Sequence, residues 1–252
     1  MKLKFVCLNL WLGGKLFPAI IDFLNEEKPD ILVAQEVYNG KILGLEDCFY
    51  SIDVLKKNCG FQYDFFSPAC IDVRKEGKIE NGNAVLSRFP ITKTKTVFFD
   101  VPFGERTNVE GGDDYSMNPR NLQYVQIKVD QIKLNVFNTQ GIWGLDGGDN
   151  ERRLKMSETI VNEIRGMDNV ILAGDFNLKP NTKTIENIEK HLRNVFKDEL
   201  TTTFNMKQKT IPGYATAVVD MIFTSNNLKV VEKYCPNVNI SDHFPLVVIL
   251  EK

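Results

Sequence analysis

Polar residues that could do chemistry follow four strongly apolar runs of this 252-residue chain. Burying carboxylates without partners is costly, so acids that converge at strand ends need a positive charge among them. A hard divalent cation with oxygen ligands meets that need, whereas two histidines and no closely spaced cysteines fit zinc less well. The polar residues are Asn9, Glu36, the pair Asp175 and Asn177, and the pair Asp242 and His243.

Each of these residues also has an ordinary structural explanation. Asn9 suits a turn, Glu36 an exposed strand end, and Asp175 a helix or turn cap. Their combination is more informative, because two specific local patterns follow one another along the chain. These patterns are GDFN at 174–177 and SDHFPL at 241–246.

The elements that would position these residues occur once in each half of the chain. Each half has a strand, a glycine-containing loop, a helix with apolar residues at helical spacing, and a buried strand that leads to an acid. The first set is a strand at 2–10, a helix over 16–24 closed by Pro29, and a strand at 31–34 before Glu36. The second is a strand at 133–139, a helix with Met156, Ile160, Val161 and Ile164 on one face, and a strand at 170–173 before Asp175.

Short strand-like runs fill much of the remaining chain, at 83–87, 95–99, 122–129, 219–224, 228–231 and 244–250. Many short strands with few helices predict an α/β sandwich, in which two packed sheets carry helices on their outer faces. Its length and 43% hydrophobic residues predict one compact domain over residues 1–252. We interpret the polar segment 104–119 as a mobile surface loop, either beside the site or simply variable.

Composition narrows the class of protein. A net charge of −2 argues against a protein that holds long nucleic acids mainly by neutralising phosphates. Five cysteines without CxxC spacing suggest reduced thiols. The N-terminus lacks a signal-peptide pattern, and no window reaches the ~20 apolar residues of a membrane helix. We expect a soluble, cytoplasmic, monomeric enzyme with no membrane span.

Six short motifs occur in order along nearly the whole chain: CLNLW with Asn9, AQEV with Glu36, NAVLSRFPI at 83–91, GDFN, VVDMIF with Asp220, and SDHFPL. Together they resemble the motif set of the endonuclease/exonuclease/phosphatase superfamily. This superfamily includes abasic-site endonucleases, pancreatic-type deoxyribonucleases and neutral sphingomyelinases. The resemblance implies a four-layer α/β sandwich with two mostly antiparallel central sheets, and a phosphoesterase site that uses Mg²⁺, for which Mn²⁺ can substitute.

The resemblance also implies a role for each motif residue. Glu36 would be the principal metal ligand, with Asn9 as a second ligand or a phosphate contact and Asp242 near the metal. Asp175 would act as base toward the attacking water. Three further residues would complete the catalytic set: Asn177 as a phosphate donor on the same strand face as Asp175, His243 as a second donor, and Asp220 as the acid that fixes the tautomer of His243 and keeps it charged.

Other residues are expected at the edge of this site. Many superfamily members have a histidine where this chain has Gln140, which can donate a hydrogen bond to phosphate but carries no charge. Arg120 is a candidate phosphate contact, because a guanidinium matches two phosphate oxygens. Trp11 and Trp143 either flank the pocket or pack in the core, and His191 is expected on the surface.

We therefore predict a hydrolase that cleaves a phosphodiester by in-line attack of an activated water. The expected partner is a phosphate-ester substrate, with nucleic acid as one option. Two alternatives stay open. One is a phosphomonoesterase that acts on a small metabolite or lipid headgroup, and the other is a catalytically weak binding or scaffold protein.

Overall fold

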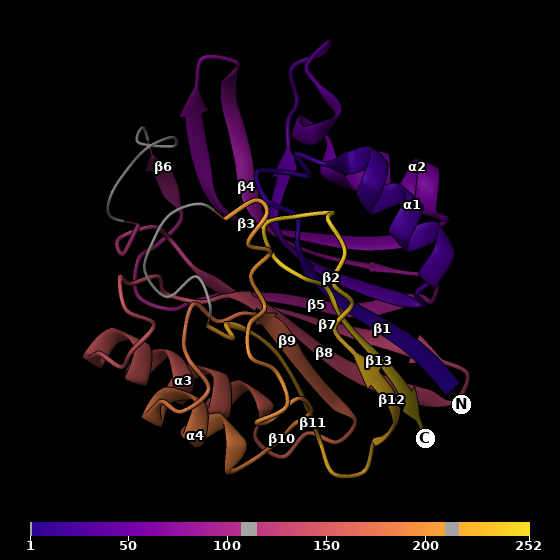
Figure 1. The fold of residues 1–252 in the computed structure, drawn as a ribbon, viewed down its shortest axis with the longest axis vertical. Helices are drawn as coiled ribbons and strands as arrows, with labels where there is room; N and C mark the ends of the chain where they lie inside the picture. The colour runs from indigo at the N-terminus through magenta and orange to yellow at the C-terminus, as the bar shows by residue number, and fades with distance from the viewer. Residues whose placement is uncertain (1, 107–114, 210–216) are drawn as a thin grey trace.

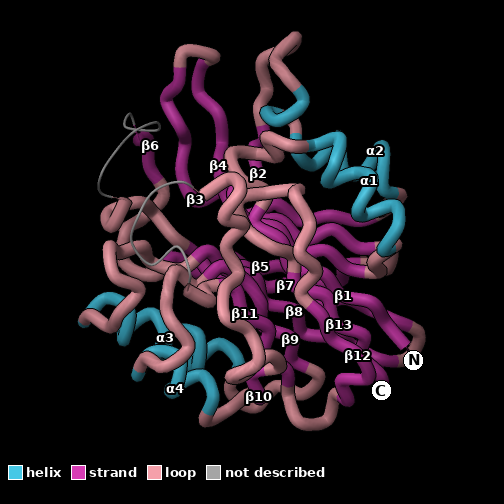
Figure 2. The backbone as a smooth tube through the Cα atoms, in the orientation of Figure 1, coloured by secondary structure: helices cyan, strands magenta, loops and turns pink. Residues whose placement is uncertain are grey.

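The structure is a computed structural model that describes residues 2–106, 115–209 and 217–252. Two mixed sheets form its centre, and helices lie on their outer sides (Figures 1 and 2). Three pairs of neighbouring strands in these sheets are parallel, and every other pair is antiparallel. The sequence prediction of an α/β sandwich is confirmed.

The first sheet has seven strands and includes both ends of the chain, which lie side by side in Figure 1. Its order is β12 (Lys229–Tyr234), β13 (Leu246–Glu251), β1 (Lys2–Asn9), β2 (Ile31–Asn39), β4 (Gly77–Ser87), β3 (Tyr63–Arg74) and β6 (Gly104–Arg106). The second sheet has six strands. Its order is β10 (Arg193–Asn194), β11 (Asp220–Thr224), β9 (Val170–Asp175), β8 (Ile132–Gln140), β7 (Asn121–Val129) and β5 (Ile91–Phe98).

Alternation along the strands divides the apolar side chains among three layers of packing. Phe5 and Cys7 of β1 face the second sheet and join the core between the sheets. Val6 and Leu8, one position along, pack under α1 (Phe17–Glu27) and α2 (Ser51–Cys59). On the far side, α3 (Glu151–Ile164) and α4 (Lys183–Glu189) cover the outer face of the second sheet. The four layers are therefore helices, sheet, sheet and helices.

Several elements differ from the sequence prediction. The second strand does not end at 34 but runs on to Asn39 as β2. Residues 104–106 form β6 rather than the start of a loop, while residues 107–114 of that segment lie outside the described residues. β3, α2, the 3₁₀ helix η1 (Asp47–Phe49) and the short β10 were not predicted, because their apolar residues are too few or too irregular to show a period.

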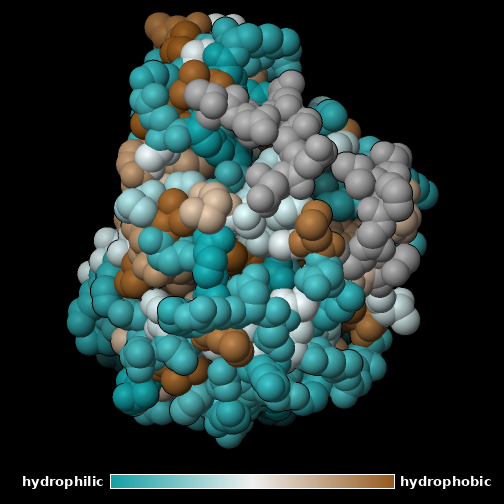
Figure 3. Space-filling view, turned by 90° about the vertical axis from the view of Figure 1, so that its left-hand side faces the viewer, coloured by the Kyte–Doolittle hydropathy of each residue, from teal (hydrophilic) through white to brown (hydrophobic). Residues whose placement is uncertain are grey.

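The surface seen in Figure 3 is mainly hydrophilic, with small hydrophobic groups scattered over it. In the described part of the chain, no helix has the length and apolarity that a membrane crossing requires. All five cysteines are free thiols, as the sequence predicts.

Candidate active site

Glu36 reaches the site because β2 contains a bulge. Ala34 pairs with Ala84 and Val37 pairs with Gly82, so one extra residue is inserted between them, and both Ala34 and Val37 face the helices. In a regular strand Glu36 would also face the helices, since it lies two positions after Ala34. Its backbone instead adopts a φ of +54°, which is uncommon for a residue with a side chain. The bulge therefore turns the carboxylate out of the apolar layer and into the site.

Asp175 is positioned by a glycine. It is the last residue of β9, and Gly174 before it has a φ of +154°. A Cβ atom at Gly174 would lie 1.9 Å from the carbonyl oxygen of Thr139, so a side chain cannot fit between β9 and β8 there. The glycine of the GDFN motif thus allows the close strand approach that sets the position of Asp175.

Asn9, Glu36 and Asp175 form one hydrogen-bonded group. The Nδ2 atom of Asn9 donates to Glu36 Oε1 and to Asp175 Oδ2, both at 3.2 Å. Glu36 also accepts from the backbone N–H of Leu12 at 3.1 Å and from Gln140 Nε2 at 2.9 Å. Burial alone would raise the pKa of Glu36, but the Leu12 hydrogen bond, the His243 charge and the Asn9 hydrogen bond lower it below its ordinary value. Glu36 is therefore held as a carboxylate.

His243 is paired with the acid that the sequence analysis assigned to it. Its Nδ1 atom lies 2.8 Å from Asp220 Oδ2, and both side chains are buried. The ring packs edge-on against Phe204, with 4.7 Å between the ring centres. Because Asp220 engages Nδ1, the Nε2 atom is left to face the pocket.

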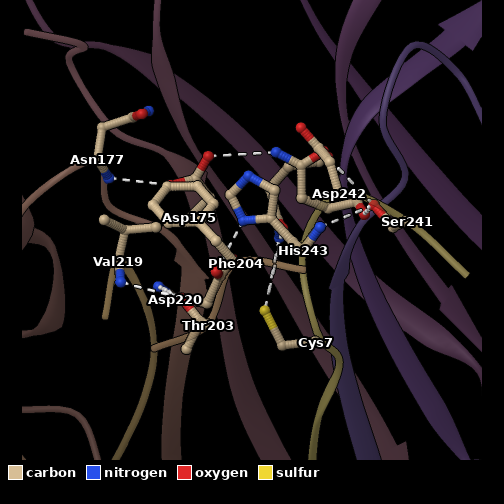
Figure 4. A network of polar contacts seen from close by, with 12 residues as sticks. Cys7, Asp175, Asn177, Thr203, Phe204, Val219, Asp220, Ser241, Asp242 and His243 are labelled. Carbon is tan, nitrogen blue, oxygen red and sulfur yellow. Dashed lines mark hydrogen bonds and ion pairs between the residues drawn. The ribbon is translucent and has the colours of Figure 1, made fainter. Parts of the chain in front are cut away.

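The charge of this pair follows from its surroundings. Burial lowers the pKa of His243, but the carboxylates of Asp220 and Asp242 outweigh it and raise the pKa to about 10. Burial raises the pKa of Asp220, and the contact with His243 offsets part of that rise. The imidazole lies among Asp175, Asp220 and Asp242 (Figure 4). His243 is thus a cationic donor at neutral pH.

Asp242 lines the same pocket from the segment that precedes β13. Burial raises its pKa, the charge of His243 opposes that rise, and the carboxylates of Glu36 and Asp175 add to it. The Ser241 hydroxyl accepts from the backbone N–H of His243 at 3.2 Å and donates to the backbone carbonyl oxygen of Asn9 at 2.7 Å. This serine ties the SDH segment to the end of β1.

The pocket has a volume of about 450 Å³ and is lined by every site residue that the sequence predicted except Asn9 and Asp220. These two lie directly behind the lining, on Glu36 and His243. Arg120 lines the pocket and donates to Gln140 Oε1, so Gln140 connects the Arg120 cation to the Glu36 carboxylate. Trp11 and Trp143 flank the pocket rather than pack in the core.

Asn177 reaches the pocket by a different route from the one predicted. The expectation that it continues the strand on the face of Asp175 is wrong, because β9 ends at Asp175 and Asn177 has a φ of +55°. Its backbone N–H donates to Asp175 Oδ1 at 3.0 Å, and its Nδ2 donates to the Gly141 carbonyl oxygen at 3.1 Å. A turn, and not strand alternation, brings Asn177 beside Asp175.

Arg153 supports this turn and was missed by the sequence analysis. Its guanidinium is 1% exposed and donates to the carbonyl oxygens of Ile142, Gly148 and Asn177. The signal was present, because Arg153 lies three residues before Met156 on the apolar face of α3. An arginine on an apolar helix face indicates buried acceptors, in this case the glycine-rich loop after β8.

Six further residues with polar or cationic side chains line the pocket without having been predicted: Lys15, Tyr38, Asn81, Arg106, Tyr115 and Lys209. None of them was singled out by the short motifs from which the site was predicted. His191 is exposed after α4, as expected. Tyr115, also in the lining, meets Trp143 edge-on with 5.4 Å between ring centres.

The donor set can be tested against a divalent cation. Glu36 and Asp242 offer carboxylate oxygens in one pocket, and their mutual repulsion contributes to the raised pKa of Asp242. Oxygen donors of this kind fit Mg²⁺ or Mn²⁺. A second group, Asp175, Asp220 and His243, has ligand atoms within 4.8 Å of one another. Of the two groups, we favour Glu36 and Asp242 as the cation site, because the 2.8 Å contact with Asp220 Oδ2 already occupies the Nδ1 atom of His243.

Comparison with known proteins identifies the family. The model of the Endonuclease/Exonuclease/phosphatase family matches residues 6–243. The chain belongs to this family. Its members hydrolyse phosphate esters and generally depend on a divalent metal, so the chain is a hydrolase of phosphate ester bonds. No curated protein sequence matches it.

Solved structures with this fold include proteins with different named activities. An endonuclease/exonuclease/phosphatase from Beutenbergia cavernae DSM 12333 is 19% identical, with a TM-score of 0.73, and the match covers 99% of this chain and 71% of that one. TDP2 from D. rerio, complexed with a single-strand DNA product, is 16% identical, with a TM-score of 0.71, and the match covers 100% of this chain and 99% of that one. The mannosyl-6-phosphatase Bt3783 from Bacteroides thetaiotaomicron VPI-5482 is 19% identical, with a TM-score of 0.68 and covers of 99% and 100%. At these identities the likeness shows the fold alone.

Proposed function

We propose that this protein is a divalent-metal-dependent phosphodiesterase that cleaves its substrate by in-line attack of water. The observation that carries the proposal is the hydrogen-bonded group of Asn9, Glu36 and Asp175 in the same pocket as the pair of His243 and Asp220. One pocket thus contains acids that can bind a cation, an acid that can act as the base, and a cationic hydrogen-bond donor. Metal-dependent phosphoryl transfer uses these three parts.

The residues of the chain divide the reaction between them. Asp175 accepts the proton of the attacking water, while hydrogen bonds from Asn9 and the Asn177 backbone orient its carboxylate. Nε2 of His243 donates to a phosphate oxygen and offsets the charge that develops there. Arg120 binds a second phosphate oxygen on the Gln140 side.

Glu36 and Asp242 would hold the cation, with Asn9 and Gln140 fixing the Glu36 carboxylate. A bound divalent cation supplies Lewis-acid polarisation of the phosphoryl group. Because residue 140 is a glutamine, His243 is the only histidine in the described lining of this pocket. Transition-state stabilisation by the side chains therefore depends mainly on His243 and Arg120.

A phosphomonoesterase is the second candidate. A pocket of about 450 Å³ lies in the size range of small-molecule sites, and the near-neutral net charge of the chain favours a small substrate. The scaffold alternative is disfavoured, because a binding protein has no need for three acids around a histidine.

A panel assay tests the proposal. Bis(p-nitrophenyl) phosphate, single-stranded RNA, an abasic duplex, a choline phosphodiester and p-nitrophenyl phosphate are each incubated with Mg²⁺, with Mn²⁺ and with chelator. We expect turnover of a diester that needs the cation and is lost in Asp175→Asn. Turnover of monoesters alone would favour the phosphomonoesterase, and no turnover of any substrate would favour the scaffold.

A further inference from the structure

Arg106 is held at the pocket by a buried acid. It lies on β6, where it pairs with Asp72 of the neighbouring β3. Its Nε and Nη2 atoms both contact the Asp72 carboxylate, the second at 2.9 Å, and Asp72 is fully buried. Asn81 also donates to Asp72 Oδ2 at 3.1 Å. The acid and the asparagine thus fix one edge of the guanidinium.

The other edge of Arg106 has no hydrogen-bond partner in the part of the chain that the structure describes. Nε and Nη2 are used on Asp72, which leaves the Nη1 donors without an acceptor among the described residues. Arg106 is in the pocket lining, and its side chain is 15% exposed. Tyr38, also in the lining, accepts a hydrogen bond from Arg74 at 3.1 Å, and its own O–H has no acceptor in the described chain. Arg106 is thus a partly exposed donor in this pocket, and Tyr38, which is 1% exposed, is a buried donor in the same lining.

Electrostatics point to an anion at this place. Burial lowers the pKa of the Arg120 guanidinium, and the charge of Arg106 lowers it further. The carboxylates of Glu36 and Asp175 offset part of this fall. Among the described residues, Arg120 Nε is buried without a hydrogen-bond partner, and the guanidinium donates to the neutral Gln140. Two cations that repel each other at one pocket wall are both stabilised when anionic groups bind between and beside them.

The pocket continues past Arg106 and Tyr38. A neighbouring cavity of about 450 Å³ shares Leu12, Lys15 and Tyr38 with the pocket. Its own lining includes Arg74 and Lys75, which lie 3.5 and 3.7 Å from the Glu76 carboxylate. The pocket therefore leaves room for a longer substrate in this direction, and Lys15 adds a cation where the two cavities meet. Trp11 also lines the pocket, and because Lys15 Nζ lies 4.3 Å from the centre of its ring on one face, a nucleotide base can stack only on the opposite face.

We propose that Arg106, together with Tyr38, binds a second phosphate of a nucleotide substrate, one position along the chain from the phosphate that is cleaved. This inference rests on the proposed phosphodiesterase function and adds its specificity. The buried Asp72 holds Arg106 in place, because a fixed guanidinium loses less conformational entropy when it binds phosphate. Arg106 is a specificity residue and takes no part in the bond cleavage.

A purely structural role would look different. Asp72 and Arg106 are cross-strand neighbours, so their ion pair could serve only to attach β6 to the sheet. Loss of such an attachment would lower stability and would slow all substrates alike. A phosphate-binding role would change the ratio between substrates that differ in one phosphate.

The test uses two matched substrate pairs. The first is the p-nitrophenyl ester of thymidine 5′-phosphate with and without a 3′-phosphate. The second is the p-nitrophenyl ester of thymidine 3′-phosphate with and without a 5′-phosphate. Values of kcat/KM with Mg²⁺ are compared for the wild type, Arg106→Lys, and Arg106→Gln combined with Asp72→Asn. The double variant avoids the unpaired buried Asp72 carboxylate that Arg106→Gln alone would leave, and its Tm is measured beside that of the wild type. Arg165→Gln, at the exposed C-cap of α3, is the matched control.

For the wild type, we expect kcat/KM in one of the two pairs to be about 10- to 100-fold higher for the ester that carries the second phosphate. This is the effect of one or two charge-assisted hydrogen bonds. The double variant loses that preference but keeps its rate on the singly charged ester, Arg106→Lys keeps part of it, and the control is unchanged. A parallel comparison of d(TpT) with d(pTpT) distinguishes an oligonucleotide from a free nucleotide as the source.

Two results would overturn the inference. One is equal kcat/KM within both pairs for the wild type, and the other is an equal loss on all esters in the double variant with a lower Tm. Neither refutes the phosphodiesterase function, which is tested separately by cation-dependent turnover of the singly charged esters.

Discussion

The pair of Asp220 and His243 provides a sharp prediction, because one carboxylate controls the charge of the catalytic donor. A pKa raised from 6.5 to about 10 corresponds to about 5 kcal/mol in favour of the imidazolium. Among the groups that raise it, Asp220 acts most strongly, with 2.8 Å between its Oδ2 and His243 Nδ1. Asp220→Asn keeps the shape of the side chain and removes this charge.

We expect Asp220→Asn to lower the pKa of His243 by about 1 to 3 pH units, because an opposite charge at this distance has an effect of that size and burial then opposes the cation. The measurement is NMR of the imidazole signals over pH 5 to 11 with chelator present. The chain has two histidines, and His191→Gln assigns the signal of His243 without ambiguity. The same variant should slow diester hydrolysis at pH 8, where the wild-type ring is still charged.

Stability should follow the same titration. The folded-state pKa of His243 lies above its unfolded value, so the ion pair contributes fully below pH 6.5 and its contribution is lost as the pH rises through about 10. The difference in unfolding free energy between wild type and Asp220→Asn should therefore be larger at pH 6 than at pH 10. If His243 titrated at the same pH in both proteins, the assignment of Asp220 as its charge partner would be refuted.

The remaining predictions concern the acids, the cation and the loop support. Asp175→Asn should lower kcat by about 10²- to 10⁴-fold with little change in KM in steady-state kinetics, because it removes the base but no phosphate contact. Mg²⁺ at a hundredfold excess over its Kd should stabilise the protein by about 2.7 kcal/mol, a rise in Tm of about 5–10 °C by calorimetry, and Glu36→Gln should abolish most of this rise. Arg153→Met should cost about 3 kcal/mol or more in urea unfolding, because it leaves buried carbonyl oxygens without donors, whereas an equal loss in the exposed Arg165→Gln would contradict this reasoning.

The sequence predicted the layers of the fold because alternation and helical spacing are local. Phe5 with Cys7 and Val6 with Leu8 separate onto two faces of β1 in the printed sequence as they do in the structure. It did not predict the bulge at Glu36, because the inserted residue lies between Ala34 and Val37, after the continuous apolar run 31–34, where no alternation can be read. Glu36 was found by its motif, and its place within β2 rather than after the strand was not predicted.

The site was predictable where chemistry is carried by short motifs, and not where it depends on distant segments. GDFN and SDH contribute Asp175 and His243, and the pocket contains both. Arg106 lies in a polar segment whose sequence shows neither strand alternation nor helical spacing, and it reaches the pocket because β6 pairs with β3. Such cross-strand neighbours are separated by 34 residues, which no local period can reveal.

The account depends on a cation held by Glu36 and Asp242, beside a phosphoryl group that faces Asp175 and His243. Anomalous diffraction from crystals soaked with Mn²⁺ and phosphate locates both directly. We predict a manganese peak at coordination distance from a Glu36 carboxylate oxygen, with the phosphate between it and His243 Nε2. A peak between Asp175, Asp220 and His243 with none at Glu36, or no peak at all, would contradict the account.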